Sequence, residues 1–188
     1  VCQKRFLKNT DRSNSLWMTP IEGSKALFVT EDPLDAIAHS QLFPGARYAY
    51  LCTGGTSTKA QREMIHSFSQ KFKLPIILGN DNDLAGQLEN FKLAYHTANA
   101  INSKTQRVLL TVNGAEREWG KDEIVAALQA VMKQRPNMIL SIPWAKDWND
   151  DLRSSKKSIS LRIAENMVRA QIETTKSEQR GMIAGKLP

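Results

Sequence analysis

The chain has 188 residues, of which 41% are apolar and 24% charged, and these globular proportions argue against an intrinsically disordered protein. No apolar run approaches the ~20 residues that span a bilayer and no signal-peptide pattern opens the chain, so we expect no membrane partner. The two cysteines, Cys2 and Cys52, provide no disulfide framework, which favours a reduced, cytoplasmic setting. Because the sequence begins at Val1 rather than Met, we expect a piece of a longer protein.

The net charge of +7 is unevenly distributed along the chain. Residues 25–152 carry 14 basic and 14 acidic side chains, whereas residues 1–24 add +2 and residues 153–188 add +5. A neutral middle with basic flanks suits a polyanion held from both sides, although basic ends are also ordinary solvated segments. We expect a basic lead-in segment at 1–24, one folded domain at 25–152 and a basic helical tail at 153–188.

Short apolar runs alternate with longer amphipathic stretches after an irregular lead-in at residues 1–20. The apolar runs predict buried strands at residues 25–30, 47–52, 74–79, 107–112 and 137–142. The amphipathic stretches predict helices at residues 33–43, 59–72, 84–102, 121–134 and 158–175. This alternation predicts an α/β fold with a mostly parallel central sheet, flanked by helices on both faces.

Carboxylates follow three of the predicted strands. They are Glu31 and Asp35 after the first strand, Asp81 and Asp83 after the third, and Asp147, Asp150 and Asp151 after the fifth. Parallel sheets bind ligands beyond the carboxyl ends of their strands, so we expect these groups to meet there. Gathered carboxylates repel one another unless a cation neutralises them, and Mg²⁺ or Mn²⁺ prefers such oxygen ligands. Each acid alone also has the ordinary explanation of a helix cap or a turn residue.

Other residues of the same loops suit nucleic-acid phosphates or bases. Gly54 and Gly55 let backbone N–H groups approach a phosphate, and the Thr56 and Thr58 hydroxyls can donate as well. The alternative for this loop is a plain turn with Thr58 as a helix cap. Further candidate phosphate contacts, each of which can instead be a solvated charge, are Lys59, Arg62, Lys146 and Arg153. Candidate base-stacking residues, which can instead pack in the core or at its rim, are Trp144 and Trp148.

Four strings, in order, resemble the Toprim domain of bacterial-type primases and related proteins. They are VTEDPLDAIAHSQ, CTGGTSTKAQREMI, ILGNDNDLAGQ and AKDWNDDL, across roughly residues 25–152. The family pattern is a strand ending in Glu, a G-T-x-x-T loop, a strand ending in D-x-D with A-G after it, and a late acidic string. The strings SLWMTP and KDWNDDL look closer still to Toprim domains of plasmid mobilisation proteins, where they accompany relaxases or primases.

This resemblance implies roles for the acidic residues. The implied catalytic residues are Glu31, Asp81 and Asp83, and the implied metal ligands are Glu31, Asp35, Asp81, Asp83, Asp147 and Asp150. The late string is one residue longer than in the primases, so the inner acid is either Asp150 or Asp151. Asp32 stands where the primase pattern usually has Gly, and we expect it to face solvent.

Three functional classes follow from the resemblance. The domain can be the metal-binding part of a primase-like nucleotidyl transferase, acting with Mg²⁺ or Mn²⁺ on nucleoside triphosphates. It can be a nuclease or nicking module, or a catalytically silent DNA-binding module of a relaxase. In each case the expected partners are DNA, in single-stranded form, and other domains of a longer parent chain from a mobile element.

Overall fold

The computed structural model of the chain describes residues 11–95, 100–102, 107–112 and 115–154, together with Val168 and Ile172. Its centre is a five-stranded sheet with the order β1-β3-β2-β4-β8. The strands are β1 (Trp17–Met18), β2 (Ala26–Thr30), β3 (Tyr48–Cys52), β4 (Ile76–Leu78) and β8 (Met138–Leu140). Within this sheet β2, β3, β4 and β8 run parallel, and β1 pairs antiparallel with β3 at one edge. The prediction of a mostly parallel central sheet is confirmed.

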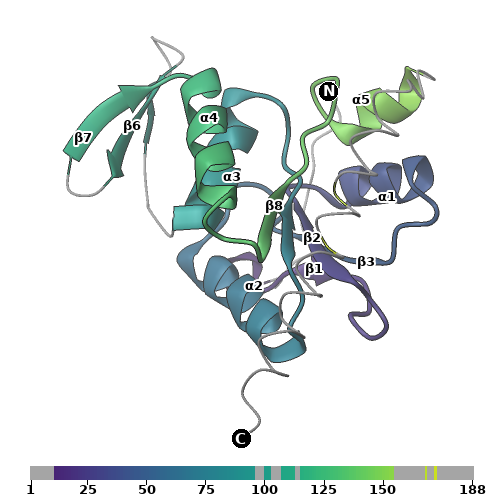
Figure 1. Cartoon of the computed structure of the whole chain (residues 1–188). Helices are drawn as coiled ribbons and strands as arrows, with labels where there is room; N and C mark the ends of the chain where they lie inside the picture. The colour runs from purple at the N-terminus through teal and green to yellow at the C-terminus, as the bar shows by residue number, and fades with distance from the viewer. Residues whose placement is uncertain are drawn as a thin grey trace, which may run out of the picture.

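Helices cover both faces of this sheet, as predicted (Figure 1). One face carries α1 (Pro33–Leu42) and α5 (Trp148–Arg153), and the other carries α2 (Lys59–Phe72), α3 (Leu84–Tyr95) and α4 (Lys121–Met132). Each face has its own apolar core, with Phe28 and Trp148 in the first and Leu27 and Phe91 in the second. Because successive side chains of a strand point to opposite faces, the fully buried strand β2 contributes to both cores.

Local sequence signals set where two of the helices begin. Thr58 and Gln61 form a capping box at α2, in which each side chain accepts a hydrogen bond from the other residue's backbone N–H. Asp32 caps α1 by accepting from the Leu34 N–H at 2.8 Å, and Pro33 occupies the first helical position, where an N–H has no helical partner. The helices predicted at 33–43, 59–72 and 121–134 are confirmed to within two residues at each end.

A second, three-stranded antiparallel sheet stands apart from the central one (Figure 1). Its strands are β5 (Ala100–Asn102), β6 (Arg107–Val112) and β7 (Ala115–Trp119). Two predictions are therefore wrong: the helix expected at 84–102 ends at Tyr95, and the strand at 107–112 does not join the central sheet. In β6 Val108 and Leu110 are buried beside α3 and α4, whereas Leu109 and Thr111 are exposed. This two-residue alternation is typical of an antiparallel strand with one solvent face.

Residues 11–20, expected to be part of an irregular lead-in, contribute to the central sheet. Thr19 follows β1 and bonds Tyr50 twice: its N–H donates to the Tyr50 carbonyl at 3.0 Å, and its hydroxyl accepts from the Tyr50 N–H at 2.9 Å. Ahead of β1, the 3-10 turn η1 (Arg12–Asn14) contacts the start of α2. A two-residue strand is too short to show an alternating pattern, which is why its sequence gives no signal.

The basic tail at 153–188 is described at its first residues and at two later positions. Val168 and Ile172 are helical and buried, with exposures of 6% and 2%, in the same core as Trp148. Their four-residue spacing places both on one face of a helix. The remainder of the helix predicted at 158–175 lies outside the described residues. None of the helices in the described ranges is long and apolar enough to cross a membrane.

Candidate metal and phosphate site

The loops that follow β2, β3 and β4 meet at one end of the central sheet. The chain leaves β2 for α1 on one face, and leaves β4 for α3 on the opposite face. Such a divergence marks the place where parallel α/β sheets bind ligands. Backbone hydrogen bonds continue beyond the strands, because Gly54 N–H donates to the Glu31 carbonyl at 2.8 Å and Gly79 N–H donates to the Val29 carbonyl at 2.9 Å. Glu31 therefore lies between the loop after β3 and the loop after β4.

Four carboxylates act on a fifth, Asp81, at this end of the sheet. The five are Glu31, Asp35, Asp81, Asp83 and Asp147, here termed the acidic cluster. Partial burial, the largest cause, and the negative charges of the other four carboxylates, Asp35 most and then Glu31, together raise the pKa of Asp81 to about 7. Residues from three separate stretches of the sequence thus converge electrostatically on Asp81.

The first motif contributes three carboxylates with different surroundings. Glu31 is partly exposed directly after β2, whereas Asp35 is 7% exposed in the first turn of α1. Asp32 is partly exposed, and one of its carboxylate oxygens caps α1. We expected Asp32 to face solvent, and the structure adds that this residue has a structural task at the start of the helix.

The D-x-D pair, Asp81 and Asp83, is held in place by the start of α3. Asp83 Oδ1 accepts a hydrogen bond from the Gly86 N–H at 2.9 Å, so one of its two oxygens acts as a helix cap. A Cβ on Gly86 would lie 2.6 Å from the backbone nitrogen of Asp81, so only glycine lets α3 approach this closely. Gln87 Nε2 adds a hydrogen bond to the Asp81 carbonyl at 2.8 Å. The A-G pair after D-x-D is thereby explained: it lets α3 hold the Asp81 backbone.

The three late acids differ in burial: Asp151 is buried, whereas Asp147 and Asp150 are partly exposed. Asp151 is 2% exposed, and its two oxygens accept the N–H groups of Trp144 and Ala145 at 2.7 and 2.6 Å. Asp150 is partly exposed, with an oxygen 4.0 Å from Arg153 Nη1. Asp147 Oδ1 caps α5 by accepting from the Asp150 N–H at 2.7 Å. Asp151 is therefore the most buried of the late acids, and both of its oxygens hold the backbone of its own loop.

The two tryptophans of this loop have opposite environments. Trp148 is 2% exposed, and its Nε1 donates to the Gly79 carbonyl at 2.8 Å. Base stacking by Trp148 is therefore wrong, because the indole fills the core and satisfies its own hydrogen bond. Trp144 is 72% exposed and remains a candidate for stacking. The loop that carries Trp144 is joined to the D-x-D loop, since Asn82 N–H donates to the Lys146 carbonyl at 2.7 Å.

The donor chemistry of the acidic cluster fits a hard divalent cation, because every member offers carboxylate oxygens and their charges repel in its absence. Within the described ranges, however, no three His, Cys, Asp or Glu side chains are arranged to hold a metal ion. Two members, Asp83 and Asp147, each use one oxygen as a helix cap. An ion would therefore be bound through the remaining oxygens, after side chains turn toward it.

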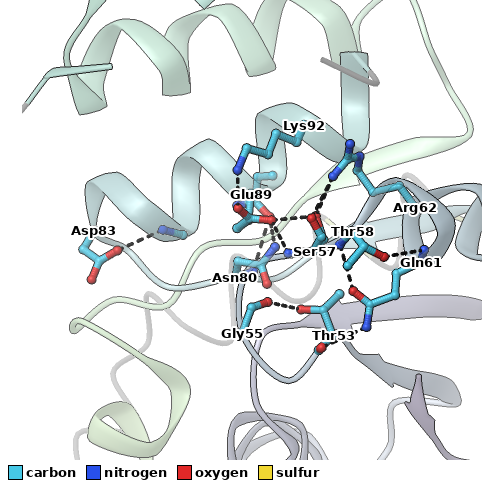
Figure 2. A network of polar contacts seen from close by, with 12 residues as sticks. Thr53, Gly55, Ser57, Thr58, Gln61, Arg62, Asn80, Asp83, Glu89 and Lys92 are labelled. Atoms are coloured by element: carbon cyan, nitrogen blue, oxygen red, sulfur yellow. Dashed lines mark hydrogen bonds and ion pairs between the residues drawn. The ribbon is translucent and has the colours of Figure 1, made fainter. Parts of the chain in front are cut away.

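The loop of residues 53–58, here termed the glycine loop, is held by side chains of α3 (Figure 2). Both the N–H and the hydroxyl of Ser57 donate to Glu89 Oε2, at 2.9 and 2.6 Å. Glu89 Oε1 in turn accepts from Lys92 Nζ at 2.7 Å, and both side chains are 8% exposed. Arg62 Nη1 donates to the Ser57 carbonyl at 2.9 Å. The ordered loop therefore depends on a buried ion pair.

Some of the predicted phosphate contacts are exposed, whereas others are already engaged in hydrogen bonds within the fold. Gly54 and Gly55 adopt φ values of 71° and 123°, which favour glycine, and Thr56 between them and α2 is exposed. The Thr58 hydroxyl caps α2 and donates to the Ser13 carbonyl at 2.6 Å, so the alternative of a helix cap is what the structure shows there. The candidate role of Arg62 is wrong, because its side chain is 6% exposed and bonded to the glycine loop.

Three other candidate cations are accessible. The side chains of Lys59, Lys146 and Arg153 are 85%, 63% and 74% exposed. Lys146 Nζ lies 3.9 Å from Asp83 Oδ2, beside the acidic cluster, whereas Lys59 lies 3.7 Å from Glu63 on the surface of α2.

The buried charged side chains that hold the glycine loop, Glu89 and Lys92, were not identified from the sequence. Glu89 and Lys92 are three residues apart in the buried helix α3, and a charged pair at that spacing between apolar residues is a usable signal. Ser57, the partner of Glu89, lies 32 residues away in sequence, so no local pattern identifies it.

A comparison with protein families matches residues 28–116 to the family described as Toprim-like. Toprim domains act generally in nucleic-acid metabolism and bind metal. The matched residues include Glu31, Asp81 and Asp83, whereas Asp147 and Asp150 lie beyond them. No curated protein and no solved structure matches the chain. The Toprim resemblance is thus supported, and the match does not separate the primase type from the mobilisation type.

Proposed function

We propose that this domain binds Mg²⁺ or Mn²⁺ at the acidic cluster and performs phosphoryl transfer on nucleic acid. The observation that carries the proposal is the convergence on Asp81, whose pKa is raised to about 7 by burial and by four neighbouring carboxylates. Carboxylates from three loops repel one another here, and a divalent cation would relieve that repulsion. Perturbed carboxyl groups of this kind gather at functional sites.

Glu31, Asp81 and Asp83 would hold the ion, with Asp35, Asp147 and Asp150 in support. When bound, the ion supplies positive charge that stabilises the attacking or leaving phosphate oxygens. Glu31 is partly exposed and is one of the charges acting on Asp81, so it can also hold or release a proton beside the reacting group. Asp83 and Asp147 each keep one carboxylate oxygen outside the helix caps.

The nucleic acid would approach across the glycine loop and the Trp144 loop. Gly54, Gly55 and Thr56 offer a phosphate the close approach of a backbone, and the exposed Trp144 offers a base an aromatic face. Lys59, Lys146 and Arg153 add exposed positive charge. On this proposal the domain belongs to a primase-like or conjugative mobilisation protein of a mobile element, acting in the cytoplasm on single-stranded DNA, with nucleoside triphosphates as substrates.

A second candidate is a catalytically silent DNA-binding module. The observation that favours it is the position of Lys146, whose ammonium group lies 3.9 Å from Asp83 Oδ2 and supplies a cation at the acidic cluster without any metal. A nicking module is a third possibility, and it shares the metal requirement of the first.

One pair of variants separates these candidates. The protein is incubated with a labelled single-stranded template, nucleoside triphosphates and Mn²⁺, and both nucleotide incorporation and strand cleavage are measured. We expect metal-dependent activity that falls by roughly 10²-fold in Glu31→Gln, as for loss of one acid–base group. The matched control, Glu63→Gln on the exposed surface of α2, should keep full activity. Metal-dependent activity retained in Glu31→Gln would refute the assignment, and metal-independent binding without turnover would favour the silent module.

A further inference from the structure

The glycine loop has a cation beside it that comes from outside the predicted domain. A Cβ on Gly55 would collide with Nη2 of Arg12 and would lie 3.4 Å from its Cζ. Gly55 has a φ of 123°, so the position is closed to other residues both by conformation and by the guanidinium that lies over it. Arg12 therefore covers the outer surface of the turn that carries Thr56.

The backbone beneath Arg12 is fixed by the first turn of α2. Gln61 Nε2 donates to the carbonyls of Arg12 and Ser15, at 3.0 and 2.8 Å, and the Thr58 hydroxyl donates to the Ser13 carbonyl at 2.6 Å. Gln61 is 1% exposed, and its two hydrogen bonds to this segment are partly shielded from solvent. Three tertiary hydrogen bonds thus place this arginine on the loop, although it precedes the loop by more than 40 residues.

The inner side of the same loop is fixed to the backbone of Glu31 and to α3. Gly54 N–H donates to the Glu31 carbonyl at 2.8 Å, and Ser57 is held twice by Glu89. The order in space is therefore the Arg12 guanidinium, the glycine turn with its exposed threonine, and the backbone of Glu31, whose carboxylate belongs to the acidic cluster. A cluster of carboxylates repels phosphate, so a phosphate group beside it needs a cation on its other side.

We propose that Arg12 and the Gly55–Thr56 turn form a binding site for a phosphate group next to the acidic cluster. A guanidinium presents parallel N–H donors to two phosphate oxygens, and the exposed Thr56 hydroxyl in the same turn can donate as well. The inference rests on the proposed function, because it supplies the phosphate on which that chemistry acts. The same chemistry suits a nucleic-acid phosphodiester and the phosphates of a nucleotide, and the experiment separates the two.

The test measures binding in EDTA, where no divalent ion contributes. Affinity for a fluorescent oligothymidylate and for a nucleoside triphosphate is titrated at several salt concentrations with wild type, Arg12→Ala and Arg47→Ala. Arg47 is an exposed arginine beside the amino-terminal end of β3, at the opposite end of the sheet, so its variant changes the net charge equally. We expect Arg12→Ala to weaken binding roughly tenfold, as for loss of a charged hydrogen bond. For the oligonucleotide its slope of log K against log salt should fall by about 0.7, one single-strand phosphate contact.

Each outcome decides one point. A selective loss with the oligonucleotide assigns the site to nucleic-acid backbone, and a selective loss with the triphosphate assigns it to a nucleotide. Equal effects of Arg12→Ala and Arg47→Ala, or no binding of either ligand by wild type, would overturn the proposal. If Arg12→Ala lowers stability, Arg12→Gln, which keeps most of the side-chain stem, must show the same loss. Because no metal is present, failure here leaves the metal-dependent activity to its own test.

Discussion

Replacing Asp81 with asparagine removes the charge on which the other carboxylates of the acidic cluster act. The pKa of Asp81 is raised from 3.8 to about 7, first by burial and then by Asp35, Glu31, Asp83 and Asp147. The folded protein therefore binds this proton more tightly than the unfolded chain does. The stability that results is fully present below pH ~4 and is lost as the pH rises through 7. At full strength the rise in pKa corresponds to ~4 kcal/mol, but Asp81 is partly exposed, and solvent screening reduces the effect to ~1–2 kcal/mol.

The assay is urea unfolding of the metal-free protein in EDTA between pH 5 and pH 8. At pH 8 we expect Asp81→Asn to be more stable than wild type by ~1–2 kcal/mol, with the difference shrinking as the pH falls toward 4. The control is Asp122→Asn, an exposed acid in the first turn of α4 that is outside the acidic cluster. It changes the net charge by the same amount and should give no gain in stability. A carboxylate in the first turn interacts favourably with the helix dipole, and this interaction is lost on substitution.

At pH 8, Mg²⁺ should make wild type more stable than Asp81→Asn, the reverse of their order without metal. An ion that binds the folded wild type stabilises it by ~2.7 kcal/mol at a concentration of 100 times the Kd, whereas Asp81→Asn should gain much less. The reasoning would be refuted if Asp81→Asn were no more stable than wild type without metal, or if Mg²⁺ stabilised both proteins equally.

Three further variants test separate parts of the site. Trp144→Ala should weaken binding of a single-stranded oligonucleotide by ~1–3 kcal/mol if one base stacks there, measured by fluorescence anisotropy, whereas Trp17→Ala on β1 should not. Glu89→Gln leaves Lys92 buried without its partner and should cost ~3 kcal/mol in urea unfolding; a cost as small as that of an exposed Glu→Gln change would show that the ion pair does not hold the fold. Gly86→Ala should cost ~1–3 kcal/mol, because its Cβ meets the Asp81 backbone. At Gly120, where the nearest atom is 3.6 Å away, alanine should cost less than ~1 kcal/mol, and equal costs would remove the packing argument.

The parts of the fold with local causes could be predicted from sequence. The strand Ala26–Thr30 is a continuous apolar run, and the helix at 59–72 has Thr58 as its cap, so each signal lies within the element itself. The second sheet could not be assigned correctly, because β6 shows the same length and apolarity as a central strand. Only its pairing with β5 and β7 distinguishes it.

The same division holds for the candidate site. The order of the acids along the chain predicted that Glu31, Asp81 and Asp83 meet, and their mutual effect on the pKa of Asp81 supports that expectation. The roles of Trp148 and Arg62 depend on distant partners, a carbonyl 69 residues away and a loop held by Glu89. Residue type alone predicts nucleic-acid contact for both, and burial overrides it.

The most direct test of the central claim is a crystal of the protein soaked in Mn²⁺, examined for anomalous scattering. The proposed function predicts a manganese peak coordinated by carboxylate oxygens of Glu31 and of the pair Asp81 and Asp83. The absence of a peak there, with the Lys146 ammonium against Asp83, would contradict it and would favour the silent DNA-binding module.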